Sequence, residues 1–290
     1  IYAIINIKKE KDMEELNNVI EFNIKDCIEF VKHRNKNSNK GDFGYIGILG
    51  GCDMYSGAIK LANLSAASIR SGSGVTRLII PKSIEQSIMP YLLEATIFQL
   101  KDNNSHIIFS PSNIDKALNK IKALAIGMGW GENEDNIEIL KYILDNYSIP
   151  VVIDADGLNT LSKMNDEILL KTKCKVILTP HLKEFERLSK IDIENIKKSP
   201  IKYAMEYAKA HKVILLLKGH TTIVTNGIDT YLINKGGAGM STAGSGDVLS
   251  GIIVGMLGSF EPTVKLISAC AYINGQLMEK LQEINQKQQR

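Results

Sequence analysis

The sequence of 290 residues lacks several features that would assign a class of protein at once. No run of apolar residues approaches the ~20 that a membrane-spanning helix needs; the longest obvious ones, such as residues 213–217, are typical of buried strands. The 35 basic and 32 acidic residues leave a formal net charge of +3, so charge does not indicate binding to nucleic acid. We therefore predict a soluble protein that binds neither membranes nor nucleic acid.

Cysteine is also scarce and widely spaced. The chain has four, with no CxxC pair, so neither a zinc site nor a disulfide framework is expected: Cys27, Cys52, Cys174 and Cys270. Reduced, mostly buried thiols of a cytoplasmic protein are the simpler interpretation. Lysines at 8, 9 and 11 interrupt the only apolar start, which argues against a signal peptide. We treat residues 1–24 as an N-terminal extension of uncertain origin and residues 25–290 as one domain.

From Gly41 onward, short apolar runs alternate with longer amphipathic segments. Runs that are apolar on both faces are typical of parallel strands covered from two sides. The pattern predicts an α/β fold with a mainly parallel central sheet and helices on both faces. Strands are expected at residues 45–49, 75–80, 124–126, 151–153, 176–178 and 213–217.

The remaining segments indicate helices and a final turn. Asn226-Gly227 separates two β-branched runs, residues 222–224 and 230–233, and predicts an antiparallel hairpin near the C-terminal end of the sheet. Ser112 is a candidate cap for the helix expected at 113–122. Helices are expected at residues 24–31, 57–71, 113–122, 136–146 and 200–211. There are no internal repeats and no low-complexity tract.

The residues that follow the predicted strands are candidates for a site, because ligands of open parallel sheets bind beyond the carboxyl ends of the strands. Glycine at such positions lets a ligand approach the backbone closely. The segments are Gly50-Gly51, Gly127-Met128-Gly129-Trp130-Gly131, Asp154-Ala155-Asp156, Thr179-Pro180-His181 and Lys218-Gly219-His220-Thr221-Thr222.

Residues 236–251, GGAGMSTAGSGDVLSG, carry the strongest signal. A glycine-rich turn that leads into an apolar helical stripe presents backbone N–H groups and the positive end of the helix dipole, which together bind phosphate. The segment is neither a Walker A motif nor a GxGxxG after a first strand. Gly244, Ser245 and Gly246 are the predicted phosphate-binding residues.

Asp247 falls in the first turn of that helix. An acid at this position can simply stabilise the helix, by about 0.3–1 kcal/mol. A carboxylate beside an anion-binding turn also repels phosphate, so we expect it to have a functional role that outweighs this repulsion. Removal of a hydroxyl proton as general base fits, and Asp247 is the predicted catalytic residue.

Four further polar residues each have two interpretations. His181 follows a strand end and is either structural or functional. Glu184 either caps the following helix or holds a hydrated Mg²⁺ ion through water, since magnesium binds through few carboxylates plus waters and phosphates. Asp154 and Asp156 are either turn residues or groups that order the waters of that ion.

Together these motifs resemble the ADP/ATP-dependent NAD(P)H-hydrate dehydratases of the ribokinase-like superfamily, in the family's order, from about residue 25 to the C-terminal helix. The terminal GSGD alone would indicate only the superfamily. The matching segments are Lys40-Gly41-Asp42-Phe43-Gly44, Ser56-Gly57-Ala58, residues 127–131, Asp154-Ala155-Asp156-Gly157-Leu158-Asn159, residues 178–181, Lys218-Gly219 with Thr221, and residues 236–251.

The resemblance implies a lyase of metabolite repair, which restores hydrated NADH or NADPH by nucleotide-dependent dehydration and releases phosphate with AMP or ADP. ADP is favoured over ATP, with Mg²⁺, and the expected assembly is a homotetramer that acts beside a separate NAD(P)H-hydrate epimerase. It implies that the hydrated cofactor contacts Ala58, Gly129, His181 and Asp247. It also implies that the nucleotide is held by Lys218, Gly219, His220, Thr221, Thr222 and Gly246.

The sequence departs from the family in two loops and at its N-terminus. Leu182-Lys183 stands where Pro-Gly is usual, and Met128 stands where proline is usual, which puts the local loop shape in doubt. Because few residues precede Gly41, we expect this chain to be the dehydratase alone, without the epimerase domain that many relatives carry. The alternatives are a kinase of the same fold for hydroxymethylpyrimidine or a sugar, a nucleotide-binding regulator without catalysis, and a scaffold protein.

Overall fold

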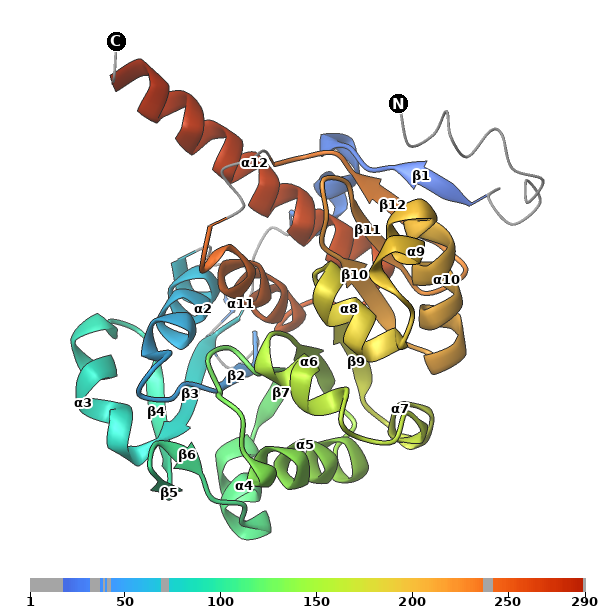
Figure 1. Ribbon diagram of the computed structural model, residues 1–290. Coiled ribbons are helices and arrows are strands. Elements are labelled where there is room, and N and C mark those ends of the chain that lie inside the picture. The colour runs from blue at the N-terminus through green and yellow to red at the C-terminus, as the bar shows by residue number, and fades with distance from the viewer. Residues whose placement is uncertain are drawn as a thin grey trace.

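A ten-stranded sheet runs through the computed structural model, which describes residues 18–31, 37, 38, 40, 43–68, 73–236 and 242–288. The strand order is β1-β12-β11-β10-β9-β8-β7-β2-β3-β4 (Figure 1). Two parts of the predicted motifs, Gly41-Asp42 and residues 237–241, lie outside the described residues.

The elements follow one another in βα order over most of the chain. They are β1 (Val19–Glu21), η1 (Ile24–Phe30), β2 (Tyr45–Leu49), α2 (Ser56–Ser68), β3 (Val75–Pro81), η2 (Lys82–Ile84), α3 (Glu85–Ile88), η3 (Met89–Tyr91), β4 (Thr96–Leu100), β5 (Asp102–Asn103), β6 (His106–Ile107), α4 (Pro111–Leu118), β7 (Ile121–Ile126), α5 (Glu134–Asn146), β8 (Pro150–Ile153), α6 (Asp156–Leu161), α7 (Glu167–Lys171), β9 (Lys175–Leu178), α8 (Leu182–Ser189), α9 (Ile193–Lys198), α10 (Pro200–His211), β10 (Ile214–Leu217), β11 (Thr222–Thr225), β12 (Thr230–Ile233), α11 (Ser245–Leu257) and α12 (Val264–Gln288).

Strand directions confirm the predicted sheet. β11 pairs antiparallel with both β10 and β12, and the remaining pairs of the large sheet are parallel. The predicted Asn226-Gly227 hairpin is present: Gly227 has φ +85°, and the Asn226 side chain accepts the N–H groups of Ile228 and Asp229, both at 2.8 Å. β1 pairs with β12, so the sheet includes residues on the N-terminal side of position 25, where the domain was predicted to begin.

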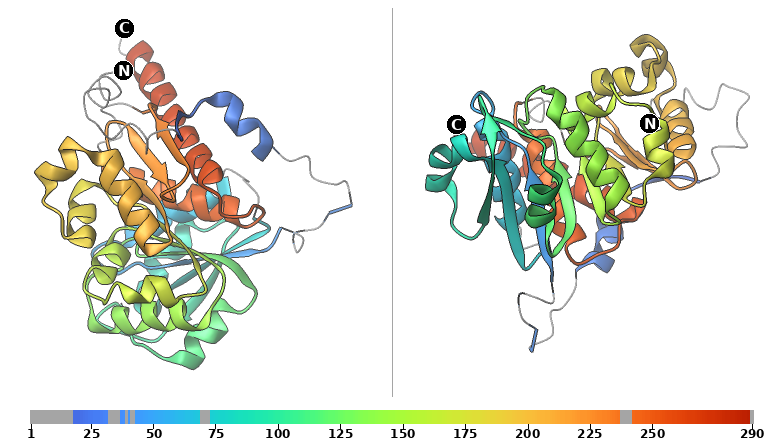
Figure 2. Two further views of the ribbon diagram at one scale, coloured as in Figure 1. Left: turned by 90° about the vertical axis from the view of Figure 1, so that its right-hand side faces the viewer. Right: turned by 90° about the horizontal axis from the view of Figure 1, so that it is seen from below.

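Side chains of the central strands alternate between two cores. Val151 and Ile153 of β8 pack with α5, α6 and α8 on one face, whereas Val152 packs with α2, α11 and α12 on the other. Figures 1 and 2 show helices on both sides of the sheet, as the two-sided apolar strands predict. The parallel strands at the centre therefore end at one edge, with helices to either side.

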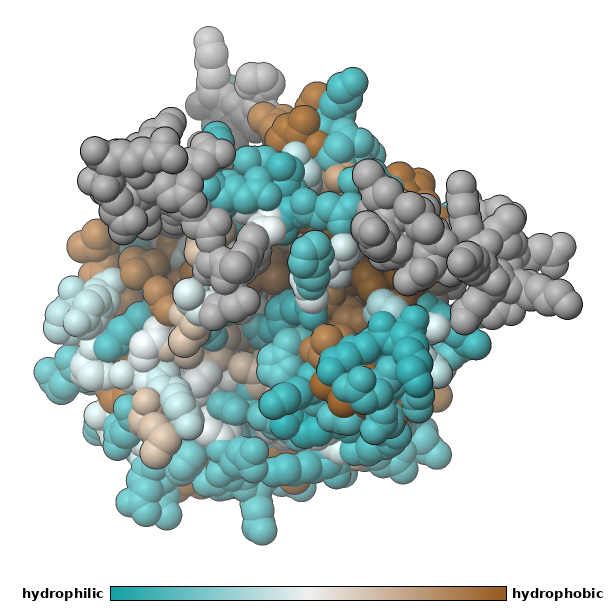
Figure 3. Space-filling model, turned by 45° about the horizontal axis from the view of Figure 1, so that its top comes forward, coloured by the Kyte–Doolittle hydropathy of each residue, from teal (hydrophilic) through white to brown (hydrophobic). Residues whose placement is uncertain are grey.

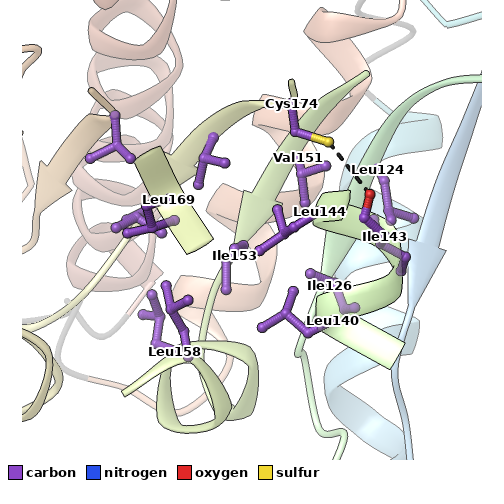
Figure 4. Packing of buried hydrophobic residues seen from close by; sticks show 14 of the residues in the cluster. Leu124, Ile126, Leu140, Ile143, Leu144, Val151, Ile153, Leu158, Leu169 and Cys174 are labelled. Carbon is purple, nitrogen blue, oxygen red and sulfur yellow. Dashed lines mark hydrogen bonds between the residues drawn. The ribbon is translucent and has the colours of Figure 1, made fainter. Parts of the chain in front are cut away.

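The core between the sheet and α5 contains one of the four cysteines. Figure 4 shows leucines and isoleucines of β7, β8 and α5 around Cys174, whose thiol lies 3.8 Å from the Ile143 carbonyl oxygen. Burial raises the pKa of the Cys174 thiol. All four cysteines are free and buried, as predicted.

Two helices begin two residues earlier than predicted: α5 begins at Glu134 instead of residue 136, and α4 differs at both ends. Helix α4 begins at Pro111 with Ser110 at the N-cap, whereas the sequence placed Ser112 there. It ends at Leu118, because Lys120 adopts φ +69° and Ile121 begins β7. Proline is favoured in the first turn of a helix, which moves the start two residues earlier.

The edge strands β1 and β4 are absent from the sequence-based prediction. They are short and partly exposed, so their apolar pattern is weak.

Among the helices that the structure describes, none combines the length and the apolar character needed to cross a bilayer. Figure 3 shows a face that is largely hydrophilic, with smaller groups of apolar residues between the polar ones.

Candidate active site

The carboxyl ends of β8, β9 and β10 bring the predicted site residues together. Asp154 follows β8, His181 follows β9 and Lys218 follows β10. His181 and Lys218 form an isolated parallel bridge, which places them side by side beyond the sheet. Helix α11 begins against the same edge, so residues from four distant parts of the sequence meet here.

Lys218 and Asp154 form the central ion pair of the site. The Lys218 Nζ lies 2.9 Å from Asp154 Oδ1, and the Ser250 hydroxyl of α11 donates to Asp154 Oδ2 at 2.7 Å. Asp154 is 1% exposed. Burial by itself would raise the pKa of Asp154, but the Lys218 charge and the hydroxyls of Ser250 and Thr179 outweigh it and lower that pKa.

The same balance keeps Lys218 charged. Burial would lower the pKa of Lys218, but the charges of Asp154 and Glu184 raise it. The Glu184 Oε2 lies 3.9 Å from Lys218 Nζ. The Lys218 side chain remains 24% exposed, while Asp154 holds its ammonium from the inner side.

Two glycines shape the entrance of α11. Gly244 occupies the N-cap with φ +95°, a conformation that favours glycine, and it supplies no capping side chain. Gly246 lies beside the ion pair: a Cβ at this position would stand 3.3 Å from Lys218 Nζ and 3.6 Å from Asp154 Oδ2. A side chain at 246 would therefore fill the space between the Lys218 ammonium and the first turn of the helix.

Asp247 lies in that first turn and has an unusual proton affinity. Burial raises its pKa to about 6, and the charges of Asp154 and Asp156 add to the increase while Lys218 opposes it. A carboxylate with this pKa accepts a proton near neutral pH and can return it, which suits a general base.

His181 and Glu184 cap helix α8 reciprocally. The His181 Nδ1 accepts the N–H groups of Lys183 and Glu184 at 3.1 and 3.2 Å, and Glu184 Oε2 accepts the His181 N–H at 2.8 Å. The capping interpretation of Glu184 is confirmed. Burial and then the Lys218 charge lower the pKa of His181, which favours the neutral ring. Because Nδ1 accepts two N–H groups, the proton of the neutral ring lies on Nε2.

The loop after β7 carries Gly129, which lies beside Ala58 of α2, and both are predicted substrate residues. Gly129 has φ +60°, and a Cβ there would collide with the Tyr55 carbonyl and stand 3.0 Å from the Ala58 Cβ. Ala58 and Gly129 are therefore adjacent, although they come from different parts of the chain. Asp156 accepts the Gly131 N–H at 2.8 Å, so it anchors this loop.

The turn between β10 and β11 holds the remaining predicted nucleotide residues. Gly219 and His220 are exposed, and Thr222 begins β11. Thr221 donates to Asn234 Oδ1 at 2.7 Å. These residues continue from Lys218 along the outer side of the site.

Sequence reasoning missed Ser250. It is fully buried within an apolar stretch of α11 and lies one turn beyond Asp247. A polar residue in the middle of an apolar helical run was the signal that could have found it, because buried hydroxyls need a hydrogen-bond partner.

No group of three or more metal-ligating side chains occurs among the residues that the structure describes. Glu184 has one carboxylate oxygen bonded to the His181 N–H, and the other lies 3.5 Å from His181 Nε2. A single carboxylate of this kind fits a magnesium ion that is held mainly by waters and phosphates.

The sheet and the glycine-rich entry of α11 define a ribokinase-like α/β protein. The structure aligns with a ribokinase-like superfamily protein of Enterococcus faecalis with a TM-score of 0.77 at 23% identity, over 92% of this chain and 89% of that one. It aligns with the ADP/ATP-dependent NAD(P)H-hydrate dehydratase of Bacillus subtilis, co-crystallized with ATP/Mg²⁺, with a TM-score of 0.78 at 27% identity, over 92% of this chain and 91% of that one.

Sequence comparison identifies the family. Residues 46–288 match the family described as NAD(P)H-hydrate dehydratase. The chain is 31% identical to the ADP-dependent (S)-NAD(P)H-hydrate dehydratase of Nitrosopumilus maritimus, over 85% of this chain and 84% of that protein. It is 30% identical to the bifunctional NAD(P)H-hydrate repair enzyme of Moorella thermoacetica, but there it spans 47% of the relative's length. The chain belongs to the NAD(P)H-hydrate dehydratase family.

Proposed function

We propose that this protein dehydrates the S form of hydrated NADH or NADPH at the expense of an adenine nucleotide. The observation that carries the proposal is the position of Asp247, a carboxyl group with a pKa of about 6, in the first turn of α11 beside the Lys218 ammonium. A base and a cation at a helix N-terminus suit phosphoryl transfer to a hydroxyl group.

The chemistry follows from the leaving group. Hydroxide leaves poorly, whereas a phosphate ester leaves well. The hydrated nicotinamide ring carries a hydroxyl group on C6. Asp247 takes the proton of this hydroxyl as the hydroxyl oxygen attacks the terminal phosphorus of the nucleotide, and the bond from that phosphorus to the bridging oxygen breaks. The ring nitrogen lone pair then expels phosphate, and loss of a proton from C5 restores the dihydronicotinamide. The nucleotide leaves as AMP from ADP or as ADP from ATP.

Protein groups around α11 would stabilise the transferred phosphoryl group. The N–H groups of Gly244, Ser245 and Gly246 lie at the N-terminal end of α11, where the helix dipole favours an anion, although the Ser245 N–H also donates to the Thr242 carbonyl oxygen at 3.4 Å. Lys218 adds a charge on the other side of Gly246. Because these groups are already fixed in the folded protein, they need no reorganisation when charge develops on the phosphoryl oxygens.

We assign the hydrated cofactor to the side of the site formed by Ala58, Gly129 and His181, with Asp247 between it and the nucleotide. Ala58 and Gly129 are adjacent, and the neutral His181 can donate from Nε2. The nucleotide would extend from Gly246 and Lys218 over Gly219, His220, Thr221 and Thr222, which line the exposed turn after β10.

ADP is the proposed phosphoryl donor. The relatives from Nitrosopumilus and Streptococcus thermophilus are named ADP-dependent, whereas that of the mouse is named ATP-dependent. Magnesium would screen the charge of the phosphates, and Glu184 would hold its waters through the carboxylate oxygen that faces His181 Nε2.

We extend the proposal to the protein's setting. A separate NAD(P)H-hydrate epimerase would supply the S form, and the active assembly would be a homotetramer. Each chain would form one domain that includes β1 as well as residues 25–290. A cytoplasmic location is in keeping with four free, buried cysteines.

The test is a recovery assay. Pure protein, hydrated NADH, Mg²⁺ and either ADP or ATP are mixed, and the absorbance of the dihydronicotinamide is followed. We expect recovery with ADP, with one phosphate released for each dihydronicotinamide regenerated. No recovery with either nucleotide would overturn the proposal, and a phosphate ester that accumulates on an added alcohol would indicate a kinase of the same fold.

A further inference from the structure

We propose that Asp154 is a positioning residue that fixes the Lys218 ammonium beneath the first turn of α11, in the place where it meets the nucleotide's phosphates. The inference rests on the proposed function, because it assumes that Lys218 binds the nucleotide. The inference gives a role to a residue, Asp154, that contacts neither the nucleotide nor the hydrated cofactor.

Asp154 is bonded from two sides by groups of different elements. One oxygen receives the Lys218 ammonium from the end of β10 at 2.9 Å, and the other receives the Ser250 hydroxyl of α11 at 2.7 Å. Both oxygens are thus committed inside the protein, and the carboxylate is 1% exposed. It cannot reach a ligand, so any effect on the reaction must pass through its partners.

The pairing determines where Lys218 can lie. A lysine side chain has four rotatable bonds and loses much freedom when its ammonium is held in one place. Asp154 supplies that constraint from the end of β8, while the absent side chain of Gly246 leaves room for the ammonium against α11. Without Asp154, the ion-pair partner that Lys218 retains within the described site is Glu184 of α8, at the longer distance of 3.9 Å.

Ser250 connects the same carboxylate to the catalytic helix. It is fully buried and lies one turn beyond Asp247. Asp154 therefore holds the position of Lys218 relative to α11, the helix that carries both the phosphate-binding turn and the base. A buried ion pair contributes little to stability when compared with apolar packing, so a role in placing charge explains the arrangement better than a role in folding.

The deciding experiment is a double-mutant cycle between Asp154→Asn and Lys218→Met. Asparagine keeps the size of the side chain and can still accept the Ser250 hydroxyl. We expect Asp154→Asn alone to lower kcat/KM for ADP by about 10- to 100-fold, the effect of a misplaced group. On the Lys218→Met background the same substitution should cause no further loss, because its target is gone. A loss that repeats in full on that background would overturn the proposal.

Two controls keep the result decisive. Ser250→Ala leaves the ion pair intact but frees one side of Asp154. We expect kcat/KM for ADP to fall by about three- to tenfold, and this loss should also vanish on the Lys218→Met background. This variant serves if Asp154→Asn does not fold, and an unchanged Ser250→Ala enzyme would then contradict the role. The acid limb of the pH profile provides a second readout: Asp154→Asn should move it to lower pH, because a negative charge near Asp247 is removed.

ADP affinity separates this inference from the proposed function. Calorimetric titration with ADP requires no turnover, and the same cycle can be read from its Kd. If the wild-type protein binds ADP but restores no hydrated cofactor, the proposed function fails, while non-additive losses of affinity would still support Asp154. If the wild type is active and the two substitutions act independently, the inference on Asp154 fails alone.

Discussion

Two aspartates within one site have pKa values that are shifted in opposite directions. Asp154, at the end of β8, is paired with Lys218 and has a lowered pKa, whereas Asp247, at the start of α11, has a pKa raised to about 6. Lys218 influences both, and its hydrogen bond goes to Asp154. Environments that separate the pKa values of neighbouring acids assign different tasks to them: Asp154 carries a fixed charge, and Asp247 exchanges a proton.

The largest expected effect comes from replacing Asp247, the acid that exchanges a proton. Asp247→Asn should lower kcat by about 10²- to 10⁴-fold, the usual contribution of general base catalysis, while ADP affinity remains because the phosphate-binding turn is untouched. Steady-state rates and calorimetric titration measure the two effects. A variant that turns over at the wild-type rate would remove Asp247 as the base.

The cation shared by the two acids should matter next. Lys218→Met should lower kcat/KM for ADP by roughly 10²-fold, since it removes a fixed group aimed at developing charge. Lys218→Arg is the matched control: it keeps the charge but changes the shape, and we expect it to recover part of the loss. If the Lys218→Met variant were as active as the wild type, the phosphates would have to bind elsewhere.

Stability should respond in opposite directions at the two aspartates. The raised pKa of Asp247 means that its ionised form destabilises the fold; this cost is absent below about pH 4 and complete above about pH 6, and at 1.36 kcal/mol per pKa unit it is on the order of 2–3 kcal/mol. Asp247→Asn should therefore stabilise the protein at pH 8 but not at pH 4.

Asp154 provides the contrast. Its lowered pKa contributes stability above the pKa of the unfolded chain, and this contribution is lost as the pH falls. Asp154→Asn should destabilise the protein at pH 8 by roughly 1.5–3 kcal/mol, the value of a hydrogen bond to a charged group. Urea unfolding of both variants measures the difference, and equal shifts of the same sign would contradict the comparison.

The smallest expected effect concerns the space beside the ion pair. Gly246→Ala places a methyl group about 3.3 Å from Lys218 Nζ, a tight contact that displaces the ammonium by a fraction of an ångström. We expect KM for ADP to rise several-fold with little change in stability, since misplacement is costly mainly for binding geometry. Ala243→Ser is a suitable control, because Ala243 is exposed and directly precedes the N-cap Gly244. Equal KM values for the two variants would contradict the role of this space.

Much of the site could be predicted because parallel strands end at one edge. Asp154, His181 and Lys218 each follow an apolar run, and the glycine-rich entry of α11 is visible as a local pattern. The hairpin could be predicted from a local signal as well, since Asn226-Gly227 determines its own turn.

Contacts between distant segments could not be predicted in this way. Asp154 and Lys218 are 64 residues apart, and Asp154 and Ser250 are 96 residues apart, so no local periodicity links them. Glu184 was left with two interpretations because capping and metal binding need the same residue type; the hydrogen bond to the His181 N–H established the first. The start of α4 shows that a proline in the first turn can outweigh a nearby serine.

The pH dependence of kcat/KM for hydrated NADH tests the central claim most directly. The wild-type enzyme should lose activity as the pH falls through about 6, because Asp247 becomes protonated and can no longer accept the hydroxyl proton. The residual activity of Asp247→Asn should lack this acid limb. An acid limb of the same midpoint in both enzymes would contradict the assignment of Asp247 as the base.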